Sequence, residues 1–145
     1  MEKFKFKFQN VLNFKIEVEE KKKNEFVKMF KNYLIQEKRL NELIERKDEA
    51  QKKKGELKTG IDCINYSRYL SYLENSIDIQ RQNLLKAKDS MEKAKEELLK
   101  SISDRKVLEK LKEKAKEEFN FYENKKEQSL NDDFALFSYI RNERR

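Results

Sequence analysis

The apolar residues of this chain recur at alternating steps of three and four, and this spacing limits what the chain can fold into. Such steps place side chains along one narrow stripe of an α-helix, as a coiled-coil seam requires. One register runs through Phe26, Met29, Tyr33, Gln36, Leu40, Leu43, Lys47, Ala50, Lys54, Leu57, Ile61 and Ile64, and a second through Leu70, Leu73, Ile77, Gln80, Leu84, Ala87, Met91, Ala94 and Leu98, with a less regular continuation at Leu108, Leu111, Ala115, Phe119 and Tyr122. The sequence therefore predicts two long amphipathic helices.

The composition supports a thin seam rather than a thick core. Of the 145 residues, 43% are charged and 37% are hydrophobic, and the chain contains two glycines and no proline. This is the composition of long helices paired along a narrow contact. Ten Phe and six Tyr argue against disorder, because disordered segments are poor in aromatic residues.

The two glycines indicate where the chain reverses. Gly55 and Gly60 lie between the two registers, and glycine is common where a helix ends or turns. Because a short connection forces neighbouring helices to run antiparallel, we predict an all-α helical hairpin. We expect a single domain over 1–145, with a first helix at about 8–58, a turn at about 59–65 and a second helix at about 66–141. Phe4 would then lie opposite the region of Ala115, and the last two or three dozen residues would extend beyond the first helix.

The residue inventory excludes several kinds of chemistry. The chain has no histidine and a single cysteine, Cys63, so it can form neither a Ser-His-Asp triad nor a Cys-His pair nor an ordinary zinc site. The stretch from Gly55 to Gly60 has the glycine spacing of a phosphate-binding loop, but Ile61 and Asp62 follow where Lys and Ser or Thr are needed. We expect no enzymatic activity, no cofactor and no metal. The chain also lacks an apolar run of about 20 residues and a secretory signal core, which predicts a cytoplasmic protein.

A segment near the predicted turn is poor in charge and rich in tyrosine. Tyr66, Tyr69, Leu70 and Leu73 follow helical spacing, and Tyr72 points elsewhere. This apolar surface is wider than one seam requires. It is either a well-packed hairpin tip or an exposed patch for a partner.

Both ends of the chain carry apolar residues that the seam does not explain. Phe4, Phe6 and Phe8 alternate with lysines, in a run too short to distinguish strand from helix. Near the other end, Leu130, Phe134 and Phe137 share one helical face with Ile140 or Arg141. The end of the second helix either frays or docks onto a partner, and docking is favoured because exposed aromatic residues are costly in water.

Four stretches together resemble the FliJ family, a small coiled-coil component of the flagellar type III export apparatus. They are FKFKFQNVLNFK, INYSRYLSYLENSIDIQRQNL, RKVLEKLKEKAKEE and LNDDFALFSYIR, in this order and over nearly the whole chain. The family is similar to the central stalk of rotary ATPases. The resemblance implies that the open end of the hairpin binds inside the hexameric ring of the export ATPase, through Phe4, Phe6, Phe8, Leu130, Phe134, Phe137 and Arg141. It also implies that Tyr66, Tyr69 and Leu73 contact the cytoplasmic domain of the export gate, where Tyr69 stands for the aromatic residue and Leu73 for the leucine of the family.

The resemblance implies a protein without catalysis of its own. It would promote assembly or activity of the ATPase, couple it to the gate at the inner face of the membrane, and bind export chaperones, with no nucleic-acid partner and no membrane span. The net charge of +7, from 35 basic and 28 acidic residues, leaves another class open: a basic coiled-coil module that binds nucleic acid or anionic membrane. A homo-oligomeric coiled-coil scaffold is a further alternative.

Overall fold

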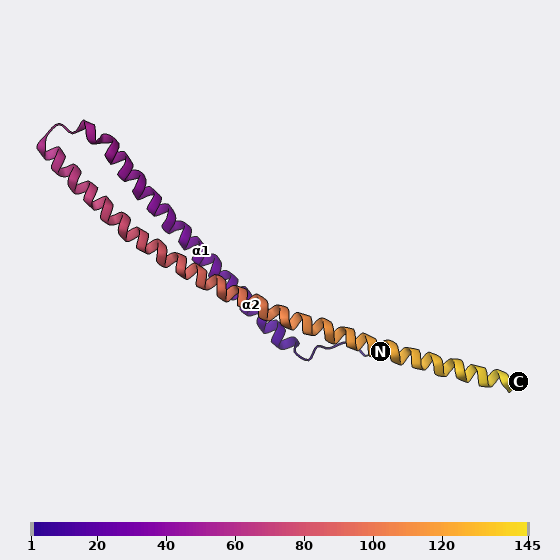
Figure 1. Ribbon diagram of the computed structural model, residues 1–145. Coiled ribbons are helices and arrows are strands. Elements are labelled where there is room, and N and C mark those ends of the chain that lie inside the picture. Colours follow the sequence, from indigo (N-terminus) through magenta and orange to yellow (C-terminus); the bar gives the residue numbers. More distant parts are fainter. Residues whose placement is uncertain (1, 145) are drawn as a thin grey trace. The chain divides into compact units, whose positions relative to one another are not determined.

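The computed structural model describes residues 2–144, which form two long helices and a short connection (Figure 1). Helix α1 comprises Gln9–Lys52, a single 3-10 turn η1 comprises Lys53–Glu56, and helix α2 comprises Gly60–Glu143. No strand occurs within the described residues. The predicted all-α helical hairpin is therefore confirmed.

The chain divides into two compact units, which are described separately. Unit 1 contains the described residues 2–18 and 102–144, and unit 2 contains residues 19–101. Each unit therefore combines a part of α1 with a part of α2.

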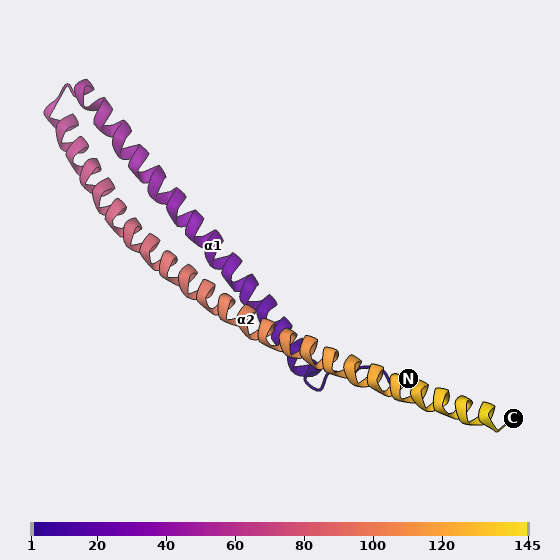
Figure 2. The same cartoon turned by 45° about the vertical axis from the view of Figure 1, so that its right-hand side comes forward.

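In unit 2 the helices run antiparallel and pack along the predicted seam. Figures 1 and 2 show α1 and α2 side by side up to their connection. Lys22 pairs with Glu97 at 3.0 Å and Lys47 with Glu74 at 3.7 Å, so residue numbers fall along α2 as they rise along α1. The buried apolar side chains of this unit all belong to the two predicted registers: Leu40, Leu73, Ile77, Ala87 and Ala94.

The first register ends earlier than its spacing suggests. Its members are buried or half-buried as far as Ala50, whereas Lys54, Ile61 and Ile64 are exposed. The reason is that α1 ends at Lys52, so the 3.6-residue period stops there. Leu57, in the connection, is half-buried.

The second register continues further than its apolar residues suggest. Beyond Leu98 the same steps of three and four lead to Ser101, which is 6% exposed, and later to Lys112, which is half-buried. Leu111, the predicted member, is 46% exposed, and Tyr122 is 63% exposed. Polar residues thus occupy seam positions where the apolar pattern weakens. The half-buried members of this continuation include Arg105, Leu108, Ala115 and Phe119.

A polar layer interrupts the seam of unit 2. The Gln80 side chain is 8% exposed, and its Nε2 donates to the backbone oxygen of Gln36 at 2.9 Å and to Gln36 Oε1 at 2.8 Å. Gln36 Nε2 donates in turn to Asn32 Oδ1 at 3.3 Å, and Asn83 Nδ2 donates to Gln80 Oε1 at 3.4 Å. Both glutamine amides are therefore hydrogen-bonded, which offsets the cost of burying them.

A capping box, rather than glycine geometry, starts α2. Asp62 N–H donates to Thr59 Oγ1 at 3.1 Å, and Thr59 N–H donates to Asp62 Oδ2 at 3.3 Å. This reciprocal pair satisfies two donors that the first turn of a helix leaves free. No glycine among the described residues has positive φ. The reversal occupies residues 53–59, before the predicted turn at 59–65, and Gly60 is already helical.

Unit 1 holds the N-terminal residues against α2. Residues 2–6 have no regular structure, and Leu12, in the first turns of α1, is 3% exposed. The rings of Phe4 and Phe119 lie 5.6 Å apart, and Lys15 pairs with Asp104 at 3.7 Å. Phe4 therefore lies four residues from the predicted position at Ala115.

Candidate functional site

The end of α2 presents apolar side chains that no other element among the described residues covers. Every residue from 124 to 144 is exposed, and Phe134 and Phe137 are 71% and 77% exposed. In both views no other segment lies beside these last turns (Figures 1 and 2). We call residues 124–144 the tail. Its exposed aromatic residues indicate a surface that a partner covers.

The tail has two apolar stripes rather than one. Leu130, Phe134, Phe137 and Arg141 succeed one another at steps of four, three and four, and therefore share one face. An adjoining stripe is formed by Leu136, Tyr139 and Ile140, which are 59%, 62% and 45% exposed. Between the stripes Phe137, Ile140, Arg141 and Arg144 line a depression of about 350 Å³. An apolar surface bordered by two guanidinium groups suits a partner that offers both apolar contacts and carboxylates.

The N-terminal phenylalanines form a separate group in unit 1. Phe4 is half-buried against Phe119, and Phe6 meets Phe8 edge-on at a ring separation of 5.9 Å. Lys7 Nζ lies 5.6 Å from the centre of the Phe8 ring. Since Phe119 precedes the tail, the structure does not bring these residues and the tail into one cluster. They anchor the start of the chain and leave Phe8 45% exposed.

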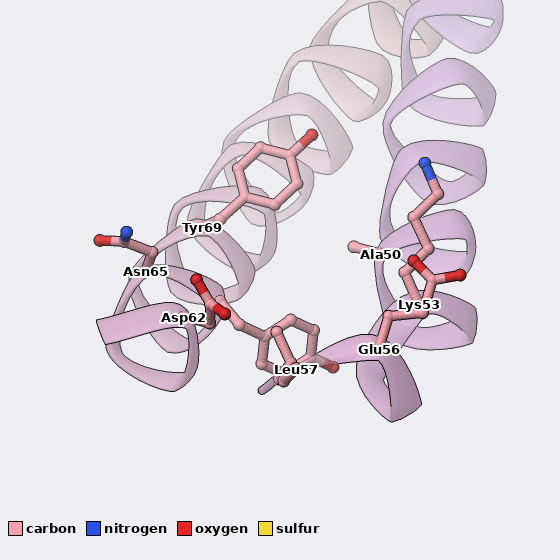
Figure 3. Close-up of a pocket in the computed structure, with 8 residues that line it drawn as sticks. Ala50, Lys53, Glu56, Leu57, Asp62, Asn65 and Tyr69 are labelled. Atoms are coloured by element: carbon pink, nitrogen blue, oxygen red, sulfur yellow. The ribbon is translucent and has the colours of Figure 1, made fainter. Parts of the chain in front are cut away.

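A pocket lies at the connection between the helices in unit 2. It has a volume of about 420 Å³ and is lined by Ala50, Lys53, Glu56, Leu57, Asp62, Asn65, Tyr66 and Tyr69. Figure 3 shows Tyr69 projecting from α2 toward α1, with Lys53 and Glu56 on the opposite side. Tyr66 is half-buried and Tyr69 is 45% exposed. The pocket thus combines aromatic faces with both signs of charge, which suits a peptide side chain more than a small anion.

Leu73 does not belong to an exposed patch. It is 1% exposed and is the one large side chain that is fully buried within residues 2–144, because it occupies a seam position facing α1. Of the two predicted alternatives, Leu73 therefore fits the packed hairpin and not the exposed patch, and Leu70 is half-buried on the same seam. Tyr69 and Tyr72, which is 64% exposed, are the accessible aromatic residues here. Whether any of them contacts the gate stays a prediction.

The electrostatics of the described residues are those of a hydrated helix surface. The hydrogen bond to Glu97, together with the nearby charges of Glu25 and Glu97, raises the pKa of Lys22. Within residues 2–144, no three His, Cys, Asp or Glu side chains gather in a way that could bind a metal ion. Neither helix contains, in the described part, a stretch long and apolar enough to span a bilayer.

Two features of the site were missed by reading apolar spacing alone. The capping box is signalled by Thr59 and Asp62, three residues apart at the start of an apolar run, which is a known helix-start pattern. The paired lysines of the seam, Lys22 and Lys47, have no such signal, because their partners Glu97 and Glu74 are distant in sequence. Each lysine meets its glutamate only because the two helices pack antiparallel in this register.

These observations define a class: an antiparallel coiled-coil hairpin whose second helix ends in an uncovered apolar segment. A family model described as Flagellar FliJ protein matches residues 4–144. The chain therefore belongs to the FliJ family and is a component of the flagellar protein export apparatus. No curated protein and no solved structure shows a significant match.

Proposed function

We propose that the tail inserts into the ring of the export ATPase and promotes its assembly or activity. The observation that carries this proposal is that every residue from 124 to 144 is exposed, apolar side chains included. Leu130, Phe134 and Phe137 form the apolar contact, and Arg141 pairs with carboxylates of the ring. Phe4, Phe6 and Phe8 add a second contact with the ring, separate from that of the tail.

Coupling to the export gate is the second part of the proposal. The accessible candidates are Tyr69 and Tyr66 at the pocket, which belong to unit 2 and not to the tail. Leu73 contributes indirectly: its buried side chain packs against α1 and so fixes the part of α2 that carries Tyr66 and Tyr69. Export chaperones are included as partners through family membership alone, and no surface is assigned to them.

The test is ATP hydrolysis by the purified export ATPase of the same source, titrated with the full chain. We expect stimulation by the unaltered protein and at least tenfold weaker apparent binding for the double variant Phe134→Ser/Phe137→Ser. Both side chains are more than 70% exposed, so thermal unfolding of the variant should match that of the unaltered protein. Truncation after Gln128 should abolish the effect.

A matched variant separates the tail from the rest of the surface. Tyr72→Ser removes an aromatic side chain that is 64% exposed in unit 2 and should leave stimulation unchanged. Equal stimulation by all variants, or none by the unaltered protein with an ATPase shown to be active, would refute ring insertion. For the gate, Tyr69→Ser should weaken binding to the purified cytoplasmic domain more than Tyr72→Ser does.

A further inference from the structure

The tail carries two hollows that share one side chain. The first has a volume of about 270 Å³ and is lined by Leu130, Asp133, Phe134 and Phe137. The second is the depression of about 350 Å³ lined by Phe137, Ile140, Arg141 and Arg144. Because Phe137 belongs to both, the hollows form one surface along the helix, about 21 Å long from Leu130 to Arg144 at 1.5 Å per residue. We call this surface the double hollow.

Opposite charges are sorted between the two hollows. Asp133 is the charged residue that lines the first, whereas Arg141 and Arg144 are the charged residues that line the second. All three are exposed, and none of them forms an ion pair with another residue of 2–144. A carboxylate on one side of Phe137 and two guanidinium groups on the other therefore lack a countercharge in the described part of the chain.

The remaining charged residues of the tail line neither hollow. They are Lys125, Lys126, Glu127, Asp132 and Glu143. Two of them already have partners on the same helix: Lys126 pairs with Glu123 at 3.8 Å, and the Tyr139 hydroxyl donates to Glu143 Oε1 at 2.9 Å. The charge within the double hollow is therefore set by Asp133 and the two arginines.

A surface with a carboxylate at one end and guanidinium groups at the other is complementary to itself. Two such helices that meet antiparallel, with a two-fold axis near Phe137, place the first hollow of each copy against the second hollow of the other. Asp133 of one copy then lies level with Arg141 of the other, because each of these residues is four positions from Phe137. The exposed aromatic rings of the two copies would cover one another between these charges.

We propose that the double hollow binds the same surface of a second copy of this chain, so that two tails form an antiparallel pair. Phe134 and Phe137 supply the apolar contact, and Asp133 pairs with Arg141 at each end. The contact is short compared with the interfaces of permanent dimers, so we expect monomers at about 1 µM and pairs at about 100 µM. The preceding parts of α2 leave the pair in opposite directions.

A parallel pair and a bilayer fit the double hollow less well. In a parallel pair Asp133 would face Asp133 and Arg141 would face Arg141, and like charges repel one another. A membrane with anionic head groups would attract the arginines but repel Asp132 and Asp133, which lie beside the apolar residues of the tail.

The pair and the export ATPase would use the same side chains. Phe134 and Phe137 are covered in the pair, so a paired tail cannot insert into the ring. This consequence rests on the function proposed above, whereas the pair itself does not. Measuring the mass of the protein without the ATPase tests pairing alone, and a failure of pairing leaves ring insertion intact.

The test is the mass of the full-length chain in solution, measured by sedimentation equilibrium from about 1 µM to about 100 µM. We expect the mass to rise from the monomer value of 17.7 kDa toward twice that value and no further, because a two-fold contact closes at the dimer. Asp133→Arg and Arg141→Glu each turn an attraction into a repulsion, and each should weaken pairing at least tenfold. An equimolar mixture of these two variants restores opposite charges at both ends and should pair like the unaltered protein.

The matched control is Asp132→Arg, which makes the same charge change one residue away and outside both hollows. It should pair like the unaltered protein, whereas Phe134→Ser/Phe137→Ser should weaken pairing at least tenfold. All of these positions are exposed, so thermal unfolding should match that of the unaltered protein. Recovery of pairing in the mixture also shows that neither charge-reversed variant is misfolded.

The proposal is wrong if the unaltered protein keeps the monomer mass throughout, if the mixed variants do not pair, or if Asp132→Arg weakens pairing as much as Asp133→Arg. Pairing that neither single reversal weakens would assign the association to a parallel pair or to another surface. Co-sedimentation with phosphatidylglycerol vesicles that is lost in Phe134→Ser/Phe137→Ser, without any rise in mass, would assign the double hollow to a membrane.

Discussion

Two apolar segments of α2 have similar composition and opposite surroundings. Around residues 70–94 the apolar seam positions are covered by α1, and Leu73, Ile77 and Ala87 are at most 5% exposed. In the tail, Phe134 and Phe137 are more than 70% exposed. The comparison teaches that helical spacing identifies the residues that can be buried. Which of them are buried depends on how far α1 and the N-terminal residues extend along α2.

Contacts from the N-terminal residues stop before the tail. Phe4 packs against Phe119, and after Glu123 none of the described residues is buried or half-buried. Helix α2 continues through the tail without a break. Substitutions in the covered seam and in the uncovered tail should therefore have different effects on the free energy of unfolding.

The sharpest test of this difference is truncation of one large side chain in each region. Leu73→Ala should lower the free energy of unfolding by about 2–5 kcal/mol, since it leaves a cavity in a fully buried position. Phe137→Ala should change it by less than about 0.5 kcal/mol, because its side chain is already hydrated. Urea denaturation followed by circular dichroism measures both, and a loss below about 1 kcal/mol for Leu73→Ala would contradict the packing role.

The polar layer should show the next largest effect. Gln80→Ala should cost about 1–3 kcal/mol, because it removes three hydrogen bonds, two of which link Gln80 to Gln36 across the seam. Gln128→Ala, an exposed amide in the tail, is the matched control and should be neutral.

Replacing both members of the layer tests whether it specifies the register. Gln36→Leu/Gln80→Leu should recover most of the lost stability, because it leaves no amide buried without a partner. We expect it to populate other registers or dimers, seen as extra species in native mass spectrometry. A double variant that stays uniquely monomeric would show that packing alone sets the register.

Thr59 caps the start of α2, whereas Ser129 lies inside the same helix. Thr59→Ala should cost about 1 kcal/mol, since it removes half of the reciprocal pair with Asp62. Ser129→Ala, within the tail, should be neutral or slightly stabilising, because alanine is the better helix former. Equal effects of the two substitutions in thermal unfolding would indicate that the capping box is not formed in solution.

The smallest expected effect is a difference in pH dependence. The folded pKa of Lys22 is raised by Glu97 and Glu25, so its contribution to stability is present below the unfolded lysine pKa of about 10.4 and is lost as pH rises through the folded value. Unfolding temperatures should therefore fall slightly less between about pH 9 and 11 for Lys22→Met than for the unaltered protein. Lys126→Met, in the tail, pairs only within its own helix with Glu123 at 3.8 Å and should show no such difference.

Much of the fold could be predicted because the spacing of apolar residues indicates which side chains are buried. The seam from Phe26 to Ala50 and from Leu70 to Leu98 is confirmed, and so are the antiparallel hairpin and the meeting of the N-terminal residues with α2 near Ala115. The continuation through Ser101 and Lys112 could not be predicted, because polar side chains at seam positions carry no hydropathy signal.

The candidate sites were less predictable for a related reason. Tyr69 and Leu73 share a helical stripe in the sequence, yet one is 45% and the other 1% exposed. Spacing places both on one face but cannot say where the edge of α1 falls across that face.

The pairing of Lys22 with Glu97 and of Lys47 with Glu74 also constrains how the length of such a chain can change over evolution. An insertion within one helix of the hairpin displaces every later pair unless the other helix gains a matching insertion, so length changes there should come as complementary heptads. The tail has no opposing helix and is free of this constraint. Its length and sequence can therefore follow those of a binding partner while the paired segments keep theirs.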